Sequence, residues 1–348
     1  MLNATNAIST RLVAADAAAI REAAQLIRAG ELVAFPTETV YGLGASALDP
    51  QALARVFQVK QRPLNDPLIV HLCADARSPQ AWQALGLVDA LSELQTRRAV
   101  ALLDRFAPGP LTLVLPRGAR APALLSAGLD TVALRVPSHP VAQALLCEAG
   151  VPIAAPSANR FGHVSPTTAQ HVLEDLGGRI HLILDGGPTP IGVESTVVDL
   201  CSEPPRVLRP GSISREQIAQ VLGAPIQLGH AKLRESEAAP APGMLARHYA
   251  PRVPLILCSD TDELLLQHAQ LRAQGKRAGA LLRDSQRHAC AHVQPHYLLG
   301  ETPEQVAQRL YAGLRALESA DVDAILVCPP AGSGLAEAIA DRLRRAAS

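Results

Sequence analysis

Runs of apolar residues at strand spacing and at helical spacing alternate along the first part of the chain. The segment 16–30 has apolar residues at helical spacing, an Asp at its start and Gly30 at its end, as a helix requires. Short apolar runs that break at Pro, Ser or Asn predict buried strands. This pattern predicts a layered α/β domain with function in the loops at the strand ends. The expected helices are 16–30, 50–60, 79–104, 139–150 and 212–223, and the expected strands are 31–35, 67–72, 111–116, 131–137, 151–159, 181–187 and 195–200.

The pattern restarts after a polar stretch. Strand-like and helix-like segments alternate from residue 254 to the end, which predicts a small parallel sheet of Rossmann-like type. The turn "PPAGSGLAEA" contains a lone Gly-x-Gly, and we read it as turn geometry and not as a nucleotide loop. The expected elements are strands at 254–258, 277–282 and 324–328 and helices at 262–275, 303–318 and 335–347.

The segment between these two parts reads as a linker that ends in "PGMLARHYAP", residues 242–251. Tyr249 lies here, although the 348-residue chain has only four tyrosines. A role for this tyrosine beyond that of a linker residue is therefore worth seeking. The predicted domains are 1–222, a linker at 223–252, and 253–348.

Composition narrows the class of protein. No run approaches the roughly 20 apolar residues of a membrane span, and the N-terminus lacks the apolar core of a signal peptide. We therefore expect a cytoplasmic protein without a membrane partner. The 32 basic residues balance the 32 acidic ones, so bulk charge does not indicate nucleic-acid binding. The six cysteines form no Cys-x-x-Cys pair, which favours reduced structural thiols and no protein-bound metal.

Hydroxyl-rich loops interrupt the predicted strands of the first domain. They are "FPTETVYGLG", "KQRPLNDPLIVH", "APSANRFGHVSPTT", "GVESTVVDL" and "VLRPGSIS". The second loop holds Lys60, the single lysine among the first 231 residues. Each loop taken alone is explained by turn formation or capping. A hydrolytic triad of Ser157 or Ser195 with His71 lacks the Gly-x-Ser-x-Gly elbow. Together, the cations and hydroxyls indicate anionic ligands, a nucleotide and a carboxylate, without a Walker loop.

The order of seven motifs carries a specific resemblance. "PTETVYGLG", "KQRPLNDPLIVH", "FAPGPLTLVL", "VALRVPSHP", "APSANRFGHVSPT", "GVESTVVD" and "LRPGSIS" resemble the YrdC/Sua5 family of threonylcarbamoyl-AMP synthases over residues 16–222. The linker and the α/β tail are similar to the longer Sua5 type. The resemblance implies a YrdC-like twisted mixed sheet with helices, plus the smaller Rossmann-like C-terminal domain.

The resemblance also implies a reaction. L-threonine, bicarbonate or CO2, and ATP would give L-threonylcarbamoyl-adenylate, pyrophosphate and water, a nucleotidyltransferase activity with Mg2+ accompanying ATP. A separate tRNA threonylcarbamoyl transferase complex would use the product to make N6-threonylcarbamoyladenosine, t6A. No enzyme nucleophile is required, because positioning and neutralisation of phosphate charge suffice.

Motif matching assigns residues to each ligand. Arg135 is the expected partner of the threonine carboxylate, and Lys60 and Arg62 are the expected catalytic cations beside the phosphates. The residues implied for threonine are Thr37, His71, Arg135, Ala155 and Ser195. Those implied for ATP are Arg62, Asp66, Thr131, Ser157, Ser165, Arg209 and Tyr249.

In the family, the linker closes over the active site, which implies that Tyr249 is a lid residue that excludes water. Two positions depart from the family pattern. Asp66 brings a carboxylate toward phosphate, where the family often has Asn or Lys, and "MLAR" replaces a more basic sequence after the Pro-Gly.

Two other readings stay open at this stage. The first is a double-stranded RNA-binding module without its own catalysis, in which RNA contact is the function. The second is a carbamoyl-transfer module like that of hydrogenase maturation proteins, but its acylphosphatase and zinc-finger segments are missing from the sequence. Threonine-dependent ATP turnover separates the synthase from the RNA-binding module.

Overall fold

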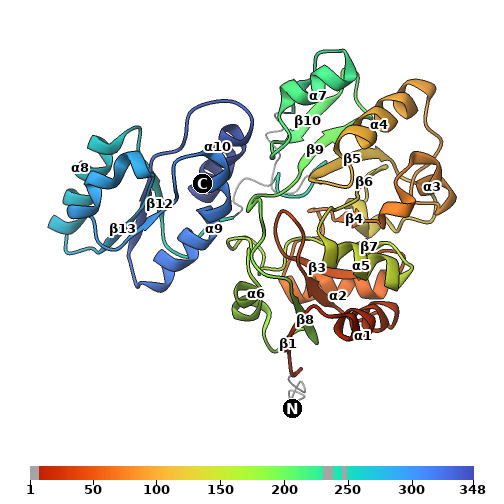
Figure 1. Cartoon of the computed structure of the whole chain (residues 1–348), viewed down its shortest axis with the longest axis horizontal. Coiled ribbons are helices and arrows are strands. Elements are labelled where there is room, and N and C mark those ends of the chain that lie inside the picture. Colours follow the sequence, from red (N-terminus) through yellow and green to blue (C-terminus); the bar gives the residue numbers. More distant parts are fainter. Residues whose placement is uncertain (1–7, 230–237, 245–248) are drawn as a thin grey trace.

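The computed structural model describes residues 8–229, 238–244 and 249–348, and it contains two β-sheets (Figure 1). The larger sheet has eleven strands in the order β1-β8-β2-β3-β7-β4-β6-β5-β9-β10-β11. The smaller sheet has four strands in the order β12-β15-β13-β14, all parallel. This mixed sheet joined to a smaller parallel one confirms the predicted fold class.

The elements of the first domain begin at β1 and end at β11. Its strands are β1 (Arg11–Ala14), β2 (Val33–Phe35), β3 (Gly42–Ser46), β4 (Ile69–His71), β5 (Leu111–Pro116), β6 (Thr131–Arg135), β7 (Ile153–Ala154), β8 (Leu182–Asp185), β9 (Thr196–Asp199), β10 (Arg206–Arg209) and β11 (Gln227–Leu228). Its helices are α1 (Ala17–Arg28), α2 (Pro50–Lys60), α3 (Pro79–Ala84), α4 (Glu93–Phe106), α5 (Pro140–Ala149), α6 (Ala169–Leu176) and α7 (Arg215–Leu222), with short 3-10 turns η1 (Ala74–Ala76) and η2 (Ala123–Ser126).

The C-terminal domain follows the expected alternation and adds one strand. Its elements are β12 (Leu255–Leu257), α8 (Thr261–Ala273), β13 (Ala278–Leu282), η3 (Asp284–Ala291), β14 (His296–Leu298), α9 (Pro303–Ser319), β15 (Ala324–Val327) and α10 (Leu335–Ala346). The sequence pattern missed β14 because the segment is only three residues long and half-buried.

Local sequence explains most helix starts. Asp16 and Asp49 accept hydrogen bonds from the first free backbone N–H groups of α1 and α2. Ser92, Ser214 and Thr302 form capping boxes at α4, α7 and α9. The expected single helix over 79–104 is wrong, because α3 ends at Ala84 and Gly86 follows with a φ of 72°.

Alternate residues of the strands feed two cores on opposite faces of the larger sheet. In β2, Val33 and Phe35 pack with α1 and α5, whereas Ala34 between them joins the core on the other face. The period of two places successive side chains on opposite faces. Hydrophobic cores therefore cover both faces of the sheet, and the polar residues that could bind ligands lie at the ends of its strands.

A third hydrophobic core joins the two domains. Val40, Val164 and Val193 of the first domain cluster with α9 and α10 residues such as Leu310 and Ile339. Figure 1 shows α9 and α10 between the two sheets and α8 on the far side of the smaller sheet. Gly192, with a φ of 86°, sits so close to α9 that a β-carbon would collide with the Ala307 carbonyl. The C-terminal domain is thus docked against the first domain.

The cysteine pairing corrects one expectation. Cys73 and Cys147 form a disulfide across 74 residues of sequence, with Cα atoms 5.3 Å apart. The sequence expectation of reduced thiols was wrong at these two positions, because β4 and α5 bring together cysteines that are far apart in the chain. Cys201, Cys258, Cys290 and Cys328 are free thiols.

Within residues 8–229, 238–244 and 249–348, no helix is long and apolar enough to cross a membrane.

Candidate active site

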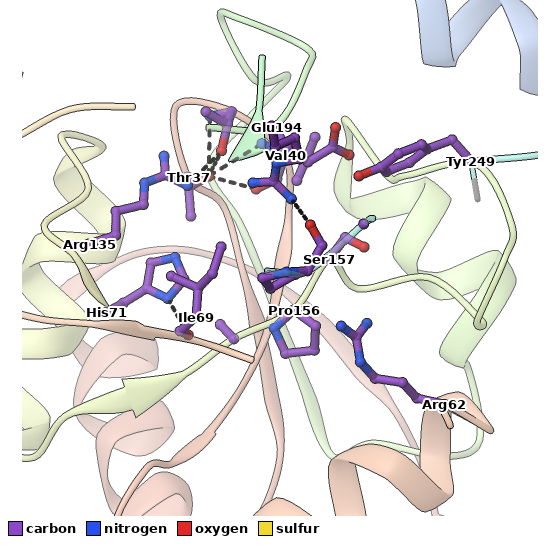
Figure 2. Close-up of a pocket in the computed structure, with 16 residues that line it drawn as sticks. Thr37, Val40, Arg62, Ile69, His71, Arg135, Pro156, Ser157, Glu194 and Tyr249 are labelled. Carbon is purple, nitrogen blue, oxygen red and sulfur yellow. Dashed lines mark hydrogen bonds between the residues drawn. The ribbon is translucent and has the colours of Figure 1, made fainter. Parts of the chain in front are cut away.

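A cavity of about 40 Å³ lies where the loops of the first domain meet the end of the linker. Three arginines line it, Arg62, Arg135 and Arg209. Figure 2 shows the side chains of Arg62 and Arg135. The other walls come from β4, the loop after β7, the loop before β9, and the linker. The remaining lining residues are Thr37, Thr39, Val40, Gly42, Ile69, His71, Ala155, Pro156, Ser157, Glu194, Pro242, Gly243 and Tyr249.

Arg135 ends β6 and is held by neighbours on three sides. Its Nη2 lies 2.8 Å from Oε1 of Glu38, its Nη1 donates to Oγ1 of Thr39 at 3.0 Å, and its Nε donates to the Gly109 carbonyl at 3.3 Å. Both ionic side chains are 5% exposed. Among the described residues, Nη2 meets Glu38 as an ion pair without a hydrogen bond, and Nη1 uses one of its two N–H groups. Both terminal nitrogens therefore keep donors for a ligand, which suits a carboxylate.

His71 and Thr37 lie beside this guanidinium. Burial, together with the charge of Arg135, lowers the pKa of His71 to about 3, so its imidazole is neutral at physiological pH. Its Nδ1 lies 3.2 Å from the Ile69 carbonyl, and its ring meets Phe35 edge-on. The Thr37 hydroxyl donates to the Val40 carbonyl at 2.7 Å and so organises the loop after β2.

Arg62 is fixed by the short turn that follows α2. Its Nη2 lies 2.9 Å from the Asp66 carboxylate, and its Nε donates to the Asp66 carbonyl at 2.9 Å. Their side chains are 2% and 0% exposed. Asp66 therefore pairs with Arg62 behind the cavity wall. The sequence suggested an unfavourable carboxylate near phosphate, but in the structure this carboxylate holds the Arg62 guanidinium in position.

Arg209 connects the loop before β9 to the linker. Its Nη2 donates to Oγ of Ser195 at 3.0 Å, its Nε to the Ser195 carbonyl at 3.1 Å, and its Nη1 to the Pro242 carbonyl at 3.0 Å. Oγ of Ser195 also lies 2.8 Å from Oγ1 of Thr112. Ser195 is fully buried and lies behind the wall, next to Arg209.

Lys60 points below the wall. Its ammonium donates to the carbonyls of Ser157, at 2.5 Å, and Asn159. Burial and the charge of Arg62 hold the pKa of Lys60 well below its ordinary value. The lysine singled out by the sequence therefore holds the loop that carries Ser157.

The structure brings most of the sequence-derived residues together, but not all of them. Thr37, His71, Arg135, Ala155, Arg62, Ser157, Arg209 and Tyr249 line the cavity. Ser165 lies one contact behind it, because its hydroxyl donates to Glu194 at 2.6 Å. Thr131 starts β6, the strand that Arg135 ends, so the two are roughly 13 Å apart along the strand. Their roles toward ligands stay predictions.

Sequence reasoning missed Thr39 and Glu194 on the wall and Glu38 behind Arg135. All three lie inside motifs quoted from the sequence. The sequence therefore showed these residue types, but not which way their side chains point. Burial raises the pKa of Glu194, but Arg342, Arg209 and hydrogen bonds outweigh this and leave it lower than usual. Glu194 is therefore an ionised carboxylate on a wall with three arginines.

Tyr249 closes the wall from the linker side. It has a φ of 64°, a left-handed conformation that costs a non-glycine residue about 1–2 kcal/mol. Its ring stacks on Tyr311 with centroids 6.0 Å apart, and the Arg342 guanidinium lies 5.1 Å from its centre. Gly243 leaves room for its hydroxyl, which a β-carbon there would strike. The expected lid also includes residues 245–248, and the linker residues 230–237, which lie outside the described residues.

Metal-ligating groups are scarce in the described part of the chain. One group there has suitable spacing, Cys73, Asp75 and Cys147. Its two sulfurs are joined in the disulfide, so it offers no thiolate ligand in this state.

The chain matches two family models along its length. Residues 25–211 match Sua5–YciO–YrdC, described as telomere recombination, and residues 213–348 match the threonylcarbamoyl-AMP synthase C-terminal domain. The chain is 42% identical to the threonylcarbamoyl-AMP synthase of Pyrococcus abyssi over 333 residues, covering 94% of this chain and 93% of the relative. It is also 42% identical to that of Bacillus subtilis over 332 residues, covering 94% and 92%.

A solved structure extends the likeness to three dimensions. The crystal structure of P. abyssi Sua5 complexed with L-threonine superposes with a TM-score of 0.87 at 41% identity, covering 98% of this chain and 97% of that one. The similarity therefore spans both domains and their arrangement.

Proposed function

The chain belongs to the Sua5–YciO–YrdC family, and we propose that it is a threonylcarbamoyl-AMP synthase. In this reaction L-threonine, bicarbonate and ATP give L-threonylcarbamoyl-adenylate, pyrophosphate and water; when CO2 is the carbon source, no water is formed. The similarity over both domains to synthases of two organisms, and to a threonine-bound structure, supports this activity.

One observation carries the proposal beyond the family likeness. Arg62, Arg135 and Arg209 converge on one cavity, and each is buried and oriented by backbone carbonyls or carboxylates. Preorganised cations of this kind stabilise charge on a transferring phosphoryl group without reorganising during the reaction. A cavity with separate cationic ends suits a triphosphate and an amino-acid carboxylate together.

Threonine binding is assigned to the side of the cavity near β4 and β6. Arg135 offers its remaining N–H donors to the threonine carboxylate. Neutral His71 and the Thr37 hydroxyl lie beside it for the polar groups of the amino acid. Ala155 and Gly42 line the same cavity, so the small side chain of threonine would lie against them.

The nucleotide is assigned to the side formed by Arg62, Arg209, Ser157 and the linker. The threonine ammonium must lose one proton before its nitrogen attacks CO2, and the nitrogen loses a second proton as the carbamate forms; solvent takes up both. A carbamate oxygen then attacks the α-phosphorus, and pyrophosphate leaves. Arg62 and Arg209 would neutralise the charge that moves onto pyrophosphate. Lys60 would act by holding Ser157 in place.

Closure by the linker belongs to the same proposal. A cavity of about 40 Å³ is far smaller than the roughly 300–1,000 Å³ of small-molecule sites. A nucleotide therefore enters only after a wall moves. The wall of Gly243 and Tyr249 comes from the linker, whereas the other walls come from strands of the larger sheet and the loops next to them. Reclosure would keep water from the mixed anhydride.

We assign Mg2+ to the bound ATP and not to a site of the protein. The product would pass to a separate transferase that modifies tRNA, and we assign the reaction to the cytoplasm.

The deciding experiment is pyrophosphate release from ATP with Mg2+ and bicarbonate, with and without L-threonine. We expect release that requires L-threonine and is weak with serine or glycine. Release independent of the amino acid, or none, would contradict the synthase and would favour the RNA-binding module, which RNA titration would then test.

A further inference from the structure

We propose that Arg342, on α10 of the C-terminal domain, is a positioning residue for the nucleotide half of the active site. It neutralises Glu194 and holds it against the wall, so that phosphate can bind to Arg209 beside a carboxylate. This inference rests on the proposed function, because it names a residue that prepares the same site from the other domain.

Glu194 is the carboxylate on the cavity wall, and all of its contacts are to donors. Its Oε1 accepts from the Ser165 hydroxyl at 2.6 Å. Its Oε2 accepts from Nε of Arg342 at 2.7 Å and from the Tyr311 hydroxyl at 3.0 Å. Two of these three partners come from α9 and α10. The C-terminal domain therefore decides where this negative charge points.

An ionised carboxylate on this wall works against the proposed ligand. Arg62 and Arg209 attract phosphate, whereas an unneutralised Glu194 on the wall of the same cavity would repel it. Glu194 could also take Arg209 as its partner and draw it away from Ser195 and the Pro242 carbonyl. A second arginine removes both problems, provided that it stays fixed on the carboxylate.

Arg342 is fixed in this way. It is 1% exposed, and its Nη2 donates to the Pro210 carbonyl at 3.0 Å, one residue after Arg209. Its Nη1 lies 2.8 Å from Asp341, and its guanidinium faces the Tyr249 ring. Arg342 thus contacts the residue next to Arg209, the lid tyrosine and the wall carboxylate, although it does not line the cavity itself.

Docking of the domain prevents Arg342 from swinging away. The core that joins the domains includes Val193, which precedes Glu194, and Ile339, one turn before Arg342 on α10, and Gly192 lets α9 approach the loop that carries Glu194. A second cluster on the same interface holds the preceding loop. There, Arg315 donates to the Val164 carbonyl at 2.5 Å and to Asp175 at 2.7 Å.

The test compares four full-length variants: Arg342→Gln, Glu194→Gln, the double variant, and Arg344→Gln. Arg344 is an exposed arginine on the same helix, so its variant is the matched control. KM for ATP, KM for L-threonine and kcat are measured from threonine-dependent pyrophosphate release between pH 6 and pH 9. ATP binding is measured separately by calorimetry.

We expect Arg342→Gln to raise KM for ATP by about tenfold or more, with KM for L-threonine within about twofold of wild type. The double variant should recover most of the ATP affinity, because the unneutralised carboxylate is gone. Arg344→Gln should match wild type. In Arg342→Gln alone, KM for ATP should fall toward low pH as Glu194 takes up a proton. The titratable groups that face Glu194 there are Arg209, Tyr249 and Tyr311.

Several outcomes would overturn the assignment. They are an unchanged KM for ATP in Arg342→Gln, an equal rise for both substrates, or a double variant no better than the single one. The last two would make Arg342 a docking residue only. If Arg342→Gln does not fold, Arg342→Lys and the double variant replace it. If wild type releases no pyrophosphate with threonine, the proposed function fails, and the calorimetric ATP affinities still decide the role of Arg342.

Discussion

The loops at the strand ends of the two domains differ in what they do with polar residues. In the first domain the ends of β6 and β10 and the turn after α2 carry buried charges, Arg135, Arg209 and Arg62, directed at one cavity. Within 253–348, all of which the structure describes, the buried polar side chains are Gln286, Arg315 and Arg342. The two arginines face the first domain, and Gln286 donates to Thr261 at the start of α8.

The smaller sheet has an architecture that often binds a nucleotide, yet the polar residues in its loops cap the helices. Asp260, after β12, caps α8 by accepting from the Glu263 amide at 2.8 Å. Gln305, after β14, pairs with Thr302 in a capping box. A parallel sheet therefore does not make a site by itself. The first domain differs from the C-terminal domain because its buried, paired charges point into a cavity.

The largest effect is expected for Arg62→Ala. It deprives the buried Asp66 of its ion-pair partner, and such a loss typically costs about 3–5 kcal/mol of stability. It also removes a cation from the proposed phosphate wall, so pyrophosphate release should fall by at least about a hundredfold, as for loss of a preorganised donor. Urea unfolding and the threonine-dependent assay measure the two losses. Near-normal turnover in a folded variant would contradict the phosphate role.

The next effect is a pH dependence from His71. Because its folded pKa of about 3 lies below the unfolded value of about 6.5, the unfolded chain binds the extra proton between these values. The free energy of unfolding should therefore fall by about 2 kcal/mol from pH 6.5 to pH 5 and stay level above pH 6.5. His71→Asn should lack this part of the decrease in urea titrations at pH 5 and pH 7.5.

His163, at the interface between the domains, should change the free energy of unfolding with pH in the opposite direction. Burial lowers its pKa, but contacts of 2.9 Å with both Asp175 and Glu318 outweigh this and raise it. Its contribution is complete below pH 6.5 and is lost as pH rises through the raised folded pKa. Removing it with His163→Asn should flatten the alkaline side of the same stability curve. If both histidines changed the pH dependence of stability in the same direction, burial alone would determine both pKa shifts.

A smaller effect is expected for Tyr249→Ala. The variant removes the ring held between Tyr311 and Arg342, so the linker should close less well on the nucleotide. We expect KM for ATP to rise about tenfold, equal to 1.4 kcal/mol, with threonine affinity nearly unchanged. Kinetics with each substrate varied in turn measure this. Unchanged ATP affinity together with an unchanged lifetime of the adenylate would remove the lid role.

The smallest effect is expected for Arg287→Ala in the C-terminal domain. Arg287 pairs with Asp284 at 3.3 Å, as Arg62 pairs with Asp66, but the side chains are 67% and 44% exposed. Solvent screening limits such a pair to about 0–1 kcal/mol. Urea unfolding should barely move, and pyrophosphate release should equal wild type. A loss comparable to that of Arg62→Ala would mean that burial does not separate the two regions.

Local signals in the sequence were sufficient for much of the fold. Asp and Ser caps, terminal glycines and apolar periodicity located α1, α2, α5, α7 and the helices of the C-terminal domain. They could not reveal β1, β3, β10 or the break between α3 and α4. β1 takes its partner from the distant β8. β3 and β10 pair with the neighbouring β2 and β9, but they are only five and four residues long, which is too short to leave a clear local period.

The sequence by itself determined the fold class, the residue types of the site and, through the order of its motifs, the family. Tertiary structure decided which way those residues point. It turned Lys60 toward the carbonyls of Ser157 and Asn159, and placed Asp66 behind Arg62. It also joined Cys73 to Cys147 and set Arg342 of the last helix on Glu194 of the first domain. The reason is physical: a buried charge must find its partner in space, and that partner can stand anywhere along the chain.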